Sequence, residues 1–193
     1  MSRRVRRRRG IALGLLAALV GLGVGLLVAS GAFDKAIKEL TLPLRHEDII
    51  RQQAREKGVD ASLIAAVIYS ESKFVDQTSG AEARGLMQII PDAAEHIARE
   101  SGATEFELKD LGDPEINIRY GTFLLAEFLE RYEGDEAAAL AAYNAGPGNA
   151  DRWGGAGLTV SDIDFPETRA YVEEVLEKRK EYREEYGQEL GYR

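Results

Sequence analysis

The sequence predicts one mainly α-helical domain, and the following features of the chain support this fold class. Apolar residues between positions 46 and 186 recur at spacings of three and four, which is the period of an α-helix. The chain has 193 residues and is 45% hydrophobic, which is enough for one domain with its own core. Glycine and proline interrupt the helical pattern as they do at helix ends, at Gly58, Gly80, Gly102, Pro114, Gly134, Gly146, Pro147, Gly148, Gly154, Gly155 and Pro166.

The N-terminal segment differs from this domain. Residues 1–10 contain six arginines and no acidic residue, and residues 11–29 contain no charged side chain. Nineteen such residues are long enough to cross a bilayer as a helix, so we expect a single-pass anchor with residues 1–10 in the cytoplasm. The alternative is a signal peptide cleaved near Ala29, Ser30 and Ala32, after which the domain would be secreted.

The remaining boundaries follow from composition. We expect residues 30–45 to form a short stalk, residues 46–186 the folded domain and residues 187–193 a tail. Within the domain, helix starts are marked by a capping Asp60 and by prolines that suit a first helical turn. The last predicted helix is charged nearly all round in its C-terminal half, which we expect to be solvated. The five predicted helices are Ala61–Lys73, Pro91–Glu100, Glu115–Tyr132, Glu136–Ala145 and Glu167–Tyr186.

Charge and residue usage exclude several classes of function. The formal net charge is −8 and the first ten residues contribute +6, so the rest of the chain carries −14. An acidic body argues against nucleic-acid binding, which depends on neutralising phosphates. The chain has no cysteine, and its two histidines, His46 and His96, lack the spacing of metal ligands. We therefore expect no metal site, and expect each histidine at the surface or at a helix end.

Glu71 is the first candidate for chemistry. It follows an apolar stripe on the predicted helix at helical spacing, so its carboxyl would lie at the rim of an apolar face. Loss of solvation raises the pKa of a carboxyl, and a raised pKa suits a general acid. The alternative is that Glu71 points to water where the helix leaves the core. The stripe consists of Leu63, Ile64, Val67 and Ile68.

Four motifs support the interpretation of Glu71 as a general acid. They are Glu71–Ser72, Gly-Leu-Met-Gln at residues 85–88, Ala-Tyr-Asn-Ala-Gly at residues 142–146, and Phe-Pro-Glu-Thr-Arg-Ala-Tyr-Val at residues 165–172. In this order they resemble the catalytic domain of the soluble lytic transglycosylases, and the resemblance covers nearly all of residues 46–180. Ile90 departs from the family pattern, in which a methionine often precedes the proline.

The resemblance implies a lysozyme-like helical domain, of the type shared with goose-type lysozymes, in which Glu71 is the catalytic acid. It implies no cofactor and no metal. Gln88 offers a donor and an acceptor to an N-acetyl group, and Tyr143 offers an aromatic face with a hydroxyl. Met87 is expected in the core, and Ser72 is either a family feature or a polar residue at a helix end. The implied substrate-binding residues are Ser79, Gln88, Tyr143, Asn144, Glu167 and Tyr171.

The resemblance also implies the reaction and the partners. Glu71 would cleave the β-1,4 bond between N-acetylmuramic acid and N-acetylglucosamine in peptidoglycan without water, leaving 1,6-anhydromuramic ends. One alternative is a hydrolase of lysozyme type, whose second carboxylate would be Asp76, Glu82 or Glu167. Another is an inactive glycan-binding module. The implied partners are glycan strands and, through the N-terminal helix, the cytoplasmic membrane; the sequence identifies no partner in a cell-wall machinery.

Overall fold

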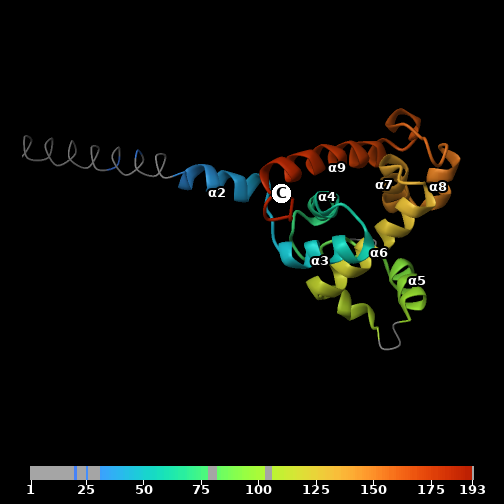
Figure 1. Ribbon diagram of the computed structural model, residues 1–193. Helices are drawn as coiled ribbons and strands as arrows, with labels where there is room; N and C mark the ends of the chain where they lie inside the picture. Colours follow the sequence, from blue (N-terminus) through green and yellow to red (C-terminus); the bar gives the residue numbers. More distant parts are fainter. Residues whose placement is uncertain (1–19, 21–24, 26–30, 78–81, 103–105, 193) are drawn as a thin grey trace, which may run out of the picture. The chain divides into compact units, whose positions relative to one another are not determined.

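The computed structural model describes Val20, Gly25 and residues 31–77, 82–102 and 106–192 (Figure 1). The chain divides into two compact units, Met1–Pro43 and Leu44–Arg193. In chain order, the elements are α2 (Ala32–Thr41), α3 (Glu47–Lys57), α4 (Ala61–Ser72), α5 (Pro91–Ser101), η1 (Leu108–Gly112), α6 (Pro114–Arg131), α7 (Glu136–Ala145), α8 (Pro147–Arg152), η2 (Val160–Asp162) and α9 (Pro166–Glu185).

The first unit contains α2, which occupies most of the predicted stalk. Its apolar side chains Phe33, Ile37 and Leu40 are exposed. The predicted anchor at residues 11–29 lies outside the described residues except for Val20 and Gly25. Among the helices that the structure does describe, none combines the length and the apolar character needed to cross a membrane.

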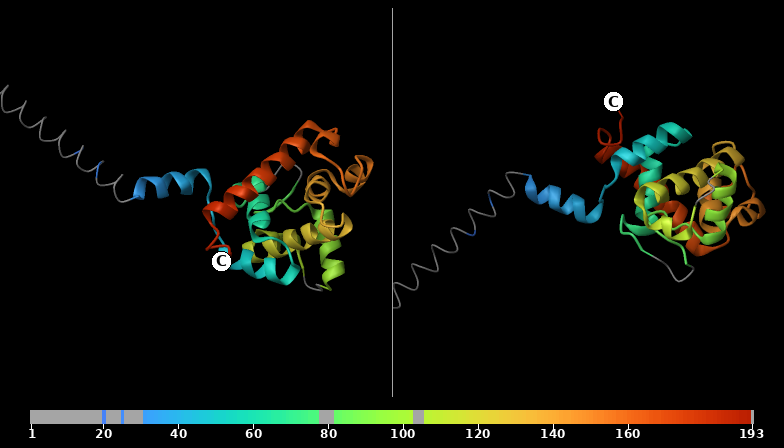
Figure 2. Two further views of the ribbon diagram at one scale, coloured as in Figure 1. Left: turned by 45° about the horizontal axis from the view of Figure 1, so that its top comes forward. Right: turned by 90° about the horizontal axis from the view of Figure 1, so that it is seen from below.

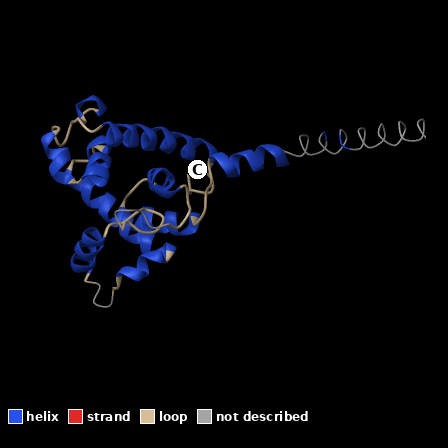
Figure 3. Cartoon of the chain, turned by 180° about the vertical axis from the view of Figure 1, so that it is seen from behind, coloured by secondary structure: helices blue, strands red, loops and turns tan. Residues whose placement is uncertain are grey.

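The second unit confirms the prediction of a mainly α-helical domain. Its described residues form helices, turns and loops (Figure 3), and their only approach to a sheet is the antiparallel bridge between Arg84 and Ile89. All five predicted helices are present, and each begins and ends within one residue of its predicted position. Helix α3 was not among the predicted helices, and Ile50 and Gln53 are its buried residues.

Helix α4 lies at the centre of the second unit. The side-chain carboxylate of Asp60 accepts hydrogen bonds from the backbone N–H groups of Ser62 and Leu63 and thereby caps its N-terminus. Every residue from Ala61 to Ile68 is buried, so the predicted apolar stripe lies in the core and the burial extends beyond it to the whole of this stretch. The neighbours of α4 explain this wider burial, because α9 packs along it and α3 also contacts it (Figure 1; Figure 2, left).

The C-terminal half of α9 is less solvated than the sequence suggested. Tyr182 has no exposed surface, and its ring packs against the rings of Tyr69 and Phe74 with centroid distances of 6.2 and 6.1 Å. A helix that is charged nearly all round can therefore still be anchored by one aromatic residue. This contact holds α9 against the end of α4 that carries Glu71.

Residues after α9 also belong to the second unit, although the sequence suggested a tail from residue 187. Leu190 is buried, and the hydroxyl of Tyr192 donates a hydrogen bond of 2.6 Å to the carboxylate of Asp60. The same carboxylate lies 3.0 Å from the guanidinium of Arg183. The C-terminal segment therefore reinforces the cap of α4.

Candidate active site

A cleft with a volume of about 810 Å³ opens on one side of the second unit. Its walls come from the end of α4, the segment 83–90, helices α5 and α6, and residues 142–147 around the junction of α7 and α8. Three of the four sequence motifs therefore meet in one hollow. Glu71, Gln88, Tyr143 and Asn144 all line it.

Glu71 lies in the last turn of α4. Burial raises the pKa of its carboxyl from an ordinary value of 4.5 to about 7, and the hydroxyl of Tyr171 partly opposes this shift. Near neutral pH the carboxyl is thus divided between its protonated and charged forms. It can donate a proton and accept one afterwards, as the sequence predicted for a general acid.

Two tyrosines surround this carboxyl. The hydroxyl of Tyr143, on α7, donates a hydrogen bond of 2.9 Å to the backbone oxygen of Met87. The hydroxyl of Tyr171, on α9, is buried and has no partner of full hydrogen-bond geometry among the described residues. Burial, followed by the charge of Glu71, raises the pKa of both hydroxyls well above the usual value. Both hydroxyls therefore remain protonated, and because Tyr143 donates its hydrogen bond to Met87, Tyr171 is the donor left for Glu71.

Ser72, the last residue of α4, connects this helix to the next motif. Its buried hydroxyl donates to the backbone oxygen of Leu86 at 2.7 Å and also lies 3.1 Å from that of Ile68. The pair Glu71–Ser72 thus combines a carboxyl that faces the cleft with a hydroxyl that holds segment 85–88 in place. Ser72 is thus a polar residue at a helix end, as one of the two predicted alternatives had it, and its buried hydroxyl bonds to segment 85–88.

Gln88 lines the cleft with its amide already partly occupied. The Nε2 group donates to the backbone oxygens of Gln77 at 3.0 Å and Gly85 at 2.8 Å. Both of its N–H groups are used, so the atom that remains for a ligand is Oε1. The sequence predicted a donor and an acceptor here, and the structure leaves the acceptor.

Asn117 on α6 holds this segment from behind and was missed by sequence reasoning. It is fully buried, its Oδ1 accepts from the backbone N–H of Met87 at 2.8 Å, and its Nδ2 donates to the backbone oxygens of Arg84 and Leu111. Gly85 packs against it with φ of +75°, and a Cβ there would lie 2.1 Å from the Asn117 Nδ2. An asparagine inside an otherwise regular helix was the only available signal.

Asn144 also lines the cleft with one end of its amide engaged. Its Oδ1 accepts a hydrogen bond of 2.8 Å from the hydroxyl of Thr168, which is buried in the first turn of α9. The amide nitrogen is therefore the group that Asn144 can offer to a ligand. This bond also connects the motif at residues 142–146 with the motif at residues 165–172.

The other predicted binding residues are placed differently. Glu167 is exposed and is not part of the cleft wall, whereas Tyr171 lies behind the wall next to Glu71. Ser79 lies outside the described residues. Met87, expected in the core, is fully buried.

The wall formed by α5 and α6 holds polar residues that the sequence did not single out. His96 lies within α5, lines the cleft, and contacts the carboxylate of Glu127 on α6 at 2.9 Å. Its predicted position at the surface or at a helix end was therefore incomplete, whereas His46 does lie at a helix end, in the position before α3, without a capping hydrogen bond from its side chain. Asp92 and Glu127 are the carboxylates that share the described cleft wall with Glu71.

Comparison with known proteins agrees with this geometry. Residues 48–163 match the family model described as the transglycosylase SLT domain. The 70 kDa soluble lytic transglycosylase from Escherichia coli has a similar structure, with a TM-score of 0.73 and 32% identity over 86% of this chain and 28% of that one. The mainly helical, lysozyme-like fold expected from the sequence is confirmed by this likeness.

Curated relatives include soluble and membrane-bound proteins. The soluble lytic murein transglycosylase of Salmonella typhimurium is 34% identical over 159 residues, which are 78% of this chain and 25% of the relative. The membrane-bound lytic murein transglycosylase C of Salmonella arizonae is 35% identical over 111 residues, which are 52% of this chain and 31% of the relative. The chain thus spans about a quarter to a third of the length of these relatives.

Proposed function

Because this chain belongs to the transglycosylase SLT domain family, we propose that it is a peptidoglycan lytic transglycosylase. It cleaves the β-1,4 bond between N-acetylmuramic acid and N-acetylglucosamine and forms a 1,6-anhydromuramic end in place of a hydrolysed one. Glu71 is the catalytic acid. The proposal concerns the activity of the whole protein, whereas the relatives that support it are matched over a fraction of their length.

The observation that carries the proposal is the environment of Glu71. Its carboxyl lies in a cleft large enough for a saccharide and has a pKa of about 7. The causes of that pKa are burial and the Tyr171 hydroxyl, and no neighbouring carboxylate is among them. A lone acid that titrates near neutrality can serve as acid in one step and as base in the next.

These properties suggest the following reaction. The protonated Glu71 carboxyl donates its proton to the glycosidic oxygen, and the bond from that oxygen to the muramic C1 breaks. The N-acetyl group of the muramic residue stabilises the resulting positive charge. The Glu71 carboxylate then removes the proton from the muramic C6 hydroxyl, whose oxygen bonds to C1 and closes the anhydro ring. Glu71 ends in its original protonated form, and no water is consumed.

The cleft supplies complementary groups for the sugar. We assign Gln88 Oε1 as an acceptor for an N-acetyl N–H group and the amide nitrogen of Asn144 as a donor, since these atoms are left over by their internal hydrogen bonds. Ile90 keeps 46% of its surface exposed and offers an apolar contact to a sugar face. Tyr143 and Tyr171 lie next to the Glu71 carboxyl. The family resemblance adds Ser79 and Glu167 to the proposed substrate-binding residues.

The hydrolytic alternative requires a second carboxylate that activates water close to the scissile bond. Asp76, Glu82 and Glu167 were the candidates from sequence, and none of them belongs to the cleft wall. Asp92 and Glu127 do line the cleft, but neither affects the pKa of Glu71, and Glu127 contacts His96. The remaining alternative is an inactive glycan-binding module. Glycan binding alone does not require a carboxyl with a raised pKa, so this alternative leaves the environment of Glu71 unexplained.

We further propose that residues 11–29 anchor the protein in the cytoplasmic membrane with the catalytic domain outside. The support is the uncharged run of nineteen residues that follows six arginines. Cell fractionation tests this part separately: recovery of the intact N-terminus in the membrane fraction supports it, whereas a trimmed protein in the medium contradicts it.

The activity is tested by mass spectrometry of the muropeptides that the full chain, held in detergent micelles, releases from purified peptidoglycan. Products lighter than hydrolytic ones by one water molecule, and absent with Glu71→Gln, would establish both the reaction and its acid. Reducing ends would support the muramidase. Release of no products by a folded wild-type protein that binds glycan strands would support the binding module.

A further inference from the structure

Helix α2 in the first unit carries an exposed apolar face. Its apolar residues are spaced by three and four along the helix, so they lie within an arc of about 100° on one side. The large side chains of Phe33, Ile37 and Leu40 keep 54%, 45% and 80% of their surface exposed, and no residue of α2 is buried. The residues of this apolar face are Phe33, Ala36, Ile37 and Leu40.

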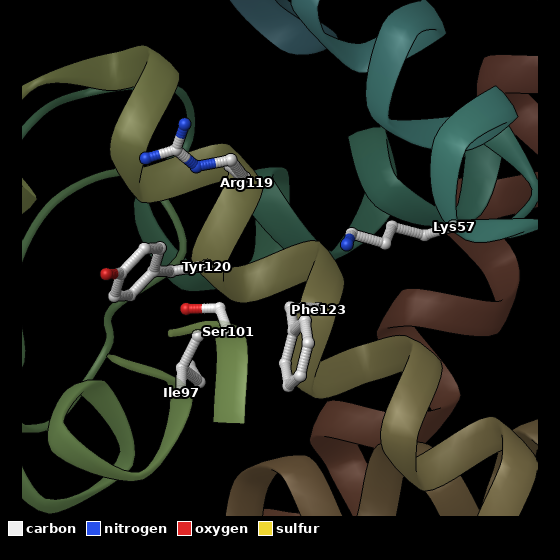
Figure 4. Close-up of a pocket in the computed structure, with 6 residues that line it drawn as sticks. All are labelled: Lys57, Ile97, Ser101, Arg119, Tyr120 and Phe123. Carbon is white, nitrogen blue, oxygen red and sulfur yellow. The ribbon is translucent and has the colours of Figure 1, made fainter. Parts of the chain in front are cut away.

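The second unit exposes its apolar residues far more sparsely. Three of its large apolar residues are exposed over the described parts of residues 44–192, whereas α2 exposes three within ten residues. A ring near the surface of the second unit is also shielded, because Lys57 Nζ lies 5.1 Å from the centre of the Phe123 ring (Figure 4). A dense exposed apolar face indicates contact with another apolar surface. The exposed residues of the second unit are Val75, Ile90 and Phe165.

The opposite face of α2 is polar and has no net charge. It carries two acidic and two basic residues, whose formal charges cancel. Attraction to a strongly charged surface therefore contributes little, and burial of the apolar face is the main driving force for any contact that α2 makes. The charged residues are Asp34, Lys35, Lys38 and Glu39.

The sequence before α2 indicates which apolar surface this face meets. The uncharged run at residues 11–29 ends three residues before the first residue of α2, Ala32. As a helix, nineteen residues measure about 28 Å, which is close to the roughly 30 Å of hydrocarbon in a bilayer. With that run as the anchor, α2 begins at the surface of the membrane.

Gly31 allows the chain to change direction at this point. It has φ of +67° and ψ of 2°, which is the left-handed conformation, so a regular α-helix does not continue through it into α2. A helix of ten residues is about 15 Å long, whereas the headgroup layer adds only about 5–8 Å on each side of the hydrocarbon. Leu40 would therefore stand in water if α2 pointed straight away from the bilayer.

We propose that α2 lies flat in the extracytoplasmic surface of the membrane, with Phe33, Ile37 and Leu40 in the lipid and the neutral polar face in water. This inference rests on the proposed anchor and not on the catalytic activity. A second copy of the chain is a poorer occupant, since one stripe of ten residues is shorter than the about three heptads that indicate a coiled coil. A flat α2 adds no height, and the second unit begins at Leu44, so the catalytic domain works close to the lipid surface.

The test is the depth of a fluorescent label in the full chain, reconstituted into phosphatidylcholine vesicles. The chain has no cysteine, so Leu40→Cys and Lys35→Cys each create a single labelling position. Quenching by lipid with brominated acyl chains should be strong at position 40 and near background at position 35, although position 35 is closer to the anchor. A helix that points away from the bilayer gives the reverse order, because depth then follows distance along the chain. Added phosphatidylglycerol should leave the quenching unchanged, since α2 has no net charge.

Variants of the apolar face provide the matched comparison. Phe33→Ser combined with Ile37→Ser, in the chain labelled at position 40, should abolish the quenching. Lys35→Ser in the same labelled chain is the control and should retain it. None of these side chains is buried, so the substitutions remove no core contact.

Extraction of the vesicles at alkaline pH separates failure of the anchor from failure of this inference. A chain that stays in the vesicles, but is quenched equally at both positions or at neither, overturns the flat position of α2 alone. Disulfide-linked dimers of the unlabelled Leu40→Cys chain, without quenching of the labelled one, would assign the apolar face to a second copy and overturn it too. A chain that is released at alkaline pH overturns the anchor, and this inference with it.

Discussion

The hydroxyl of Tyr171 on α9 lies against the carboxyl of Glu71 on α4 and lowers its pKa, while burial raises that pKa to about 7. The same hydroxyl is buried without a partner of full hydrogen-bond geometry among the described residues. An orphaned buried donor costs free energy, and its presence beside the proposed acid is explained if it stabilises the carboxylate that forms after proton transfer.

Tyr171→Phe should raise the pKa of Glu71 further, because it removes a group that stabilises the charged carboxylate. The alkaline limb of the pH–rate profile should shift to higher pH, since that limb follows the loss of the proton from the acid. The measurement is the initial rate of anhydromuropeptide release across pH. An alkaline limb at the same or lower pH would show that Tyr171 does not stabilise the carboxylate.

Glu71→Gln should stabilise the fold at neutral and alkaline pH. The folded pKa of about 7 exceeds the ordinary value of 4.5, so the wild type loses stability as pH rises from about 4.5 to 7. Above this window the variant should be more stable by up to about 3 kcal/mol, the equivalent of the shift. Below pH 4.5 the Glu71 carboxyl is protonated in both the folded and the unfolded protein, so the wild type and the variant should differ little in stability. Urea unfolding at several pH values measures this, and a pH-independent difference would contradict the burial of a titrating group.

Gly85→Ala should disrupt the segment that carries Gln88. A Cβ at Gly85 would lie 2.1 Å from Asn117 Nδ2 and 2.5 Å from the backbone oxygen of Leu111, so we expect a loss of about 3 kcal/mol or more. Gly58→Ala is the control, because Gly58 has φ of +70° with no atom within 4 Å of its Cβ position. It should cost only about 1 kcal/mol for its left-handed backbone. Similar losses in both variants would argue against the contact with Asn117.

Ser72→Ala should lower stability and activity together. It removes the hydrogen bond to the backbone oxygen of Leu86, which is worth about 1–2 kcal/mol when buried. Release of segment 85–88 should also reduce the rate, because Gln88 then loses its fixed position. Ser70→Ala is the matched variant, since the Ser70 hydroxyl on the same helix is buried with no partner among the described residues. It should be neutral or slightly stabilising, and an equal loss from both variants would refute the role given to Ser72.

The sequence was sufficient for the five predicted helices of the domain and for the choice of Glu71 as the candidate acid. Helix starts depend on residues within one turn, such as the carboxylate of Asp60 that caps α4, so they can be recognised locally. The identity of Glu71 came from a pattern of motifs. The packing around Glu71 could not be inferred in the same way. The sequence predicted one apolar stripe on α4, whereas every residue from 61 to 68 is buried.

What the sequence by itself determined was therefore which groups are present: one mainly helical domain, an acidic body, and a glutamate in a transglycosylase-like motif. Tertiary structure alone decided what state those groups are in. The pKa of Glu71 depends on desolvation by other helices, the free atom of Gln88 depends on bonds to Gln77 and Gly85, and the support from Asn117 comes from a different helix. Solvation and hydrogen-bond partners are set by residues far apart in the chain, so local pattern does not reveal them.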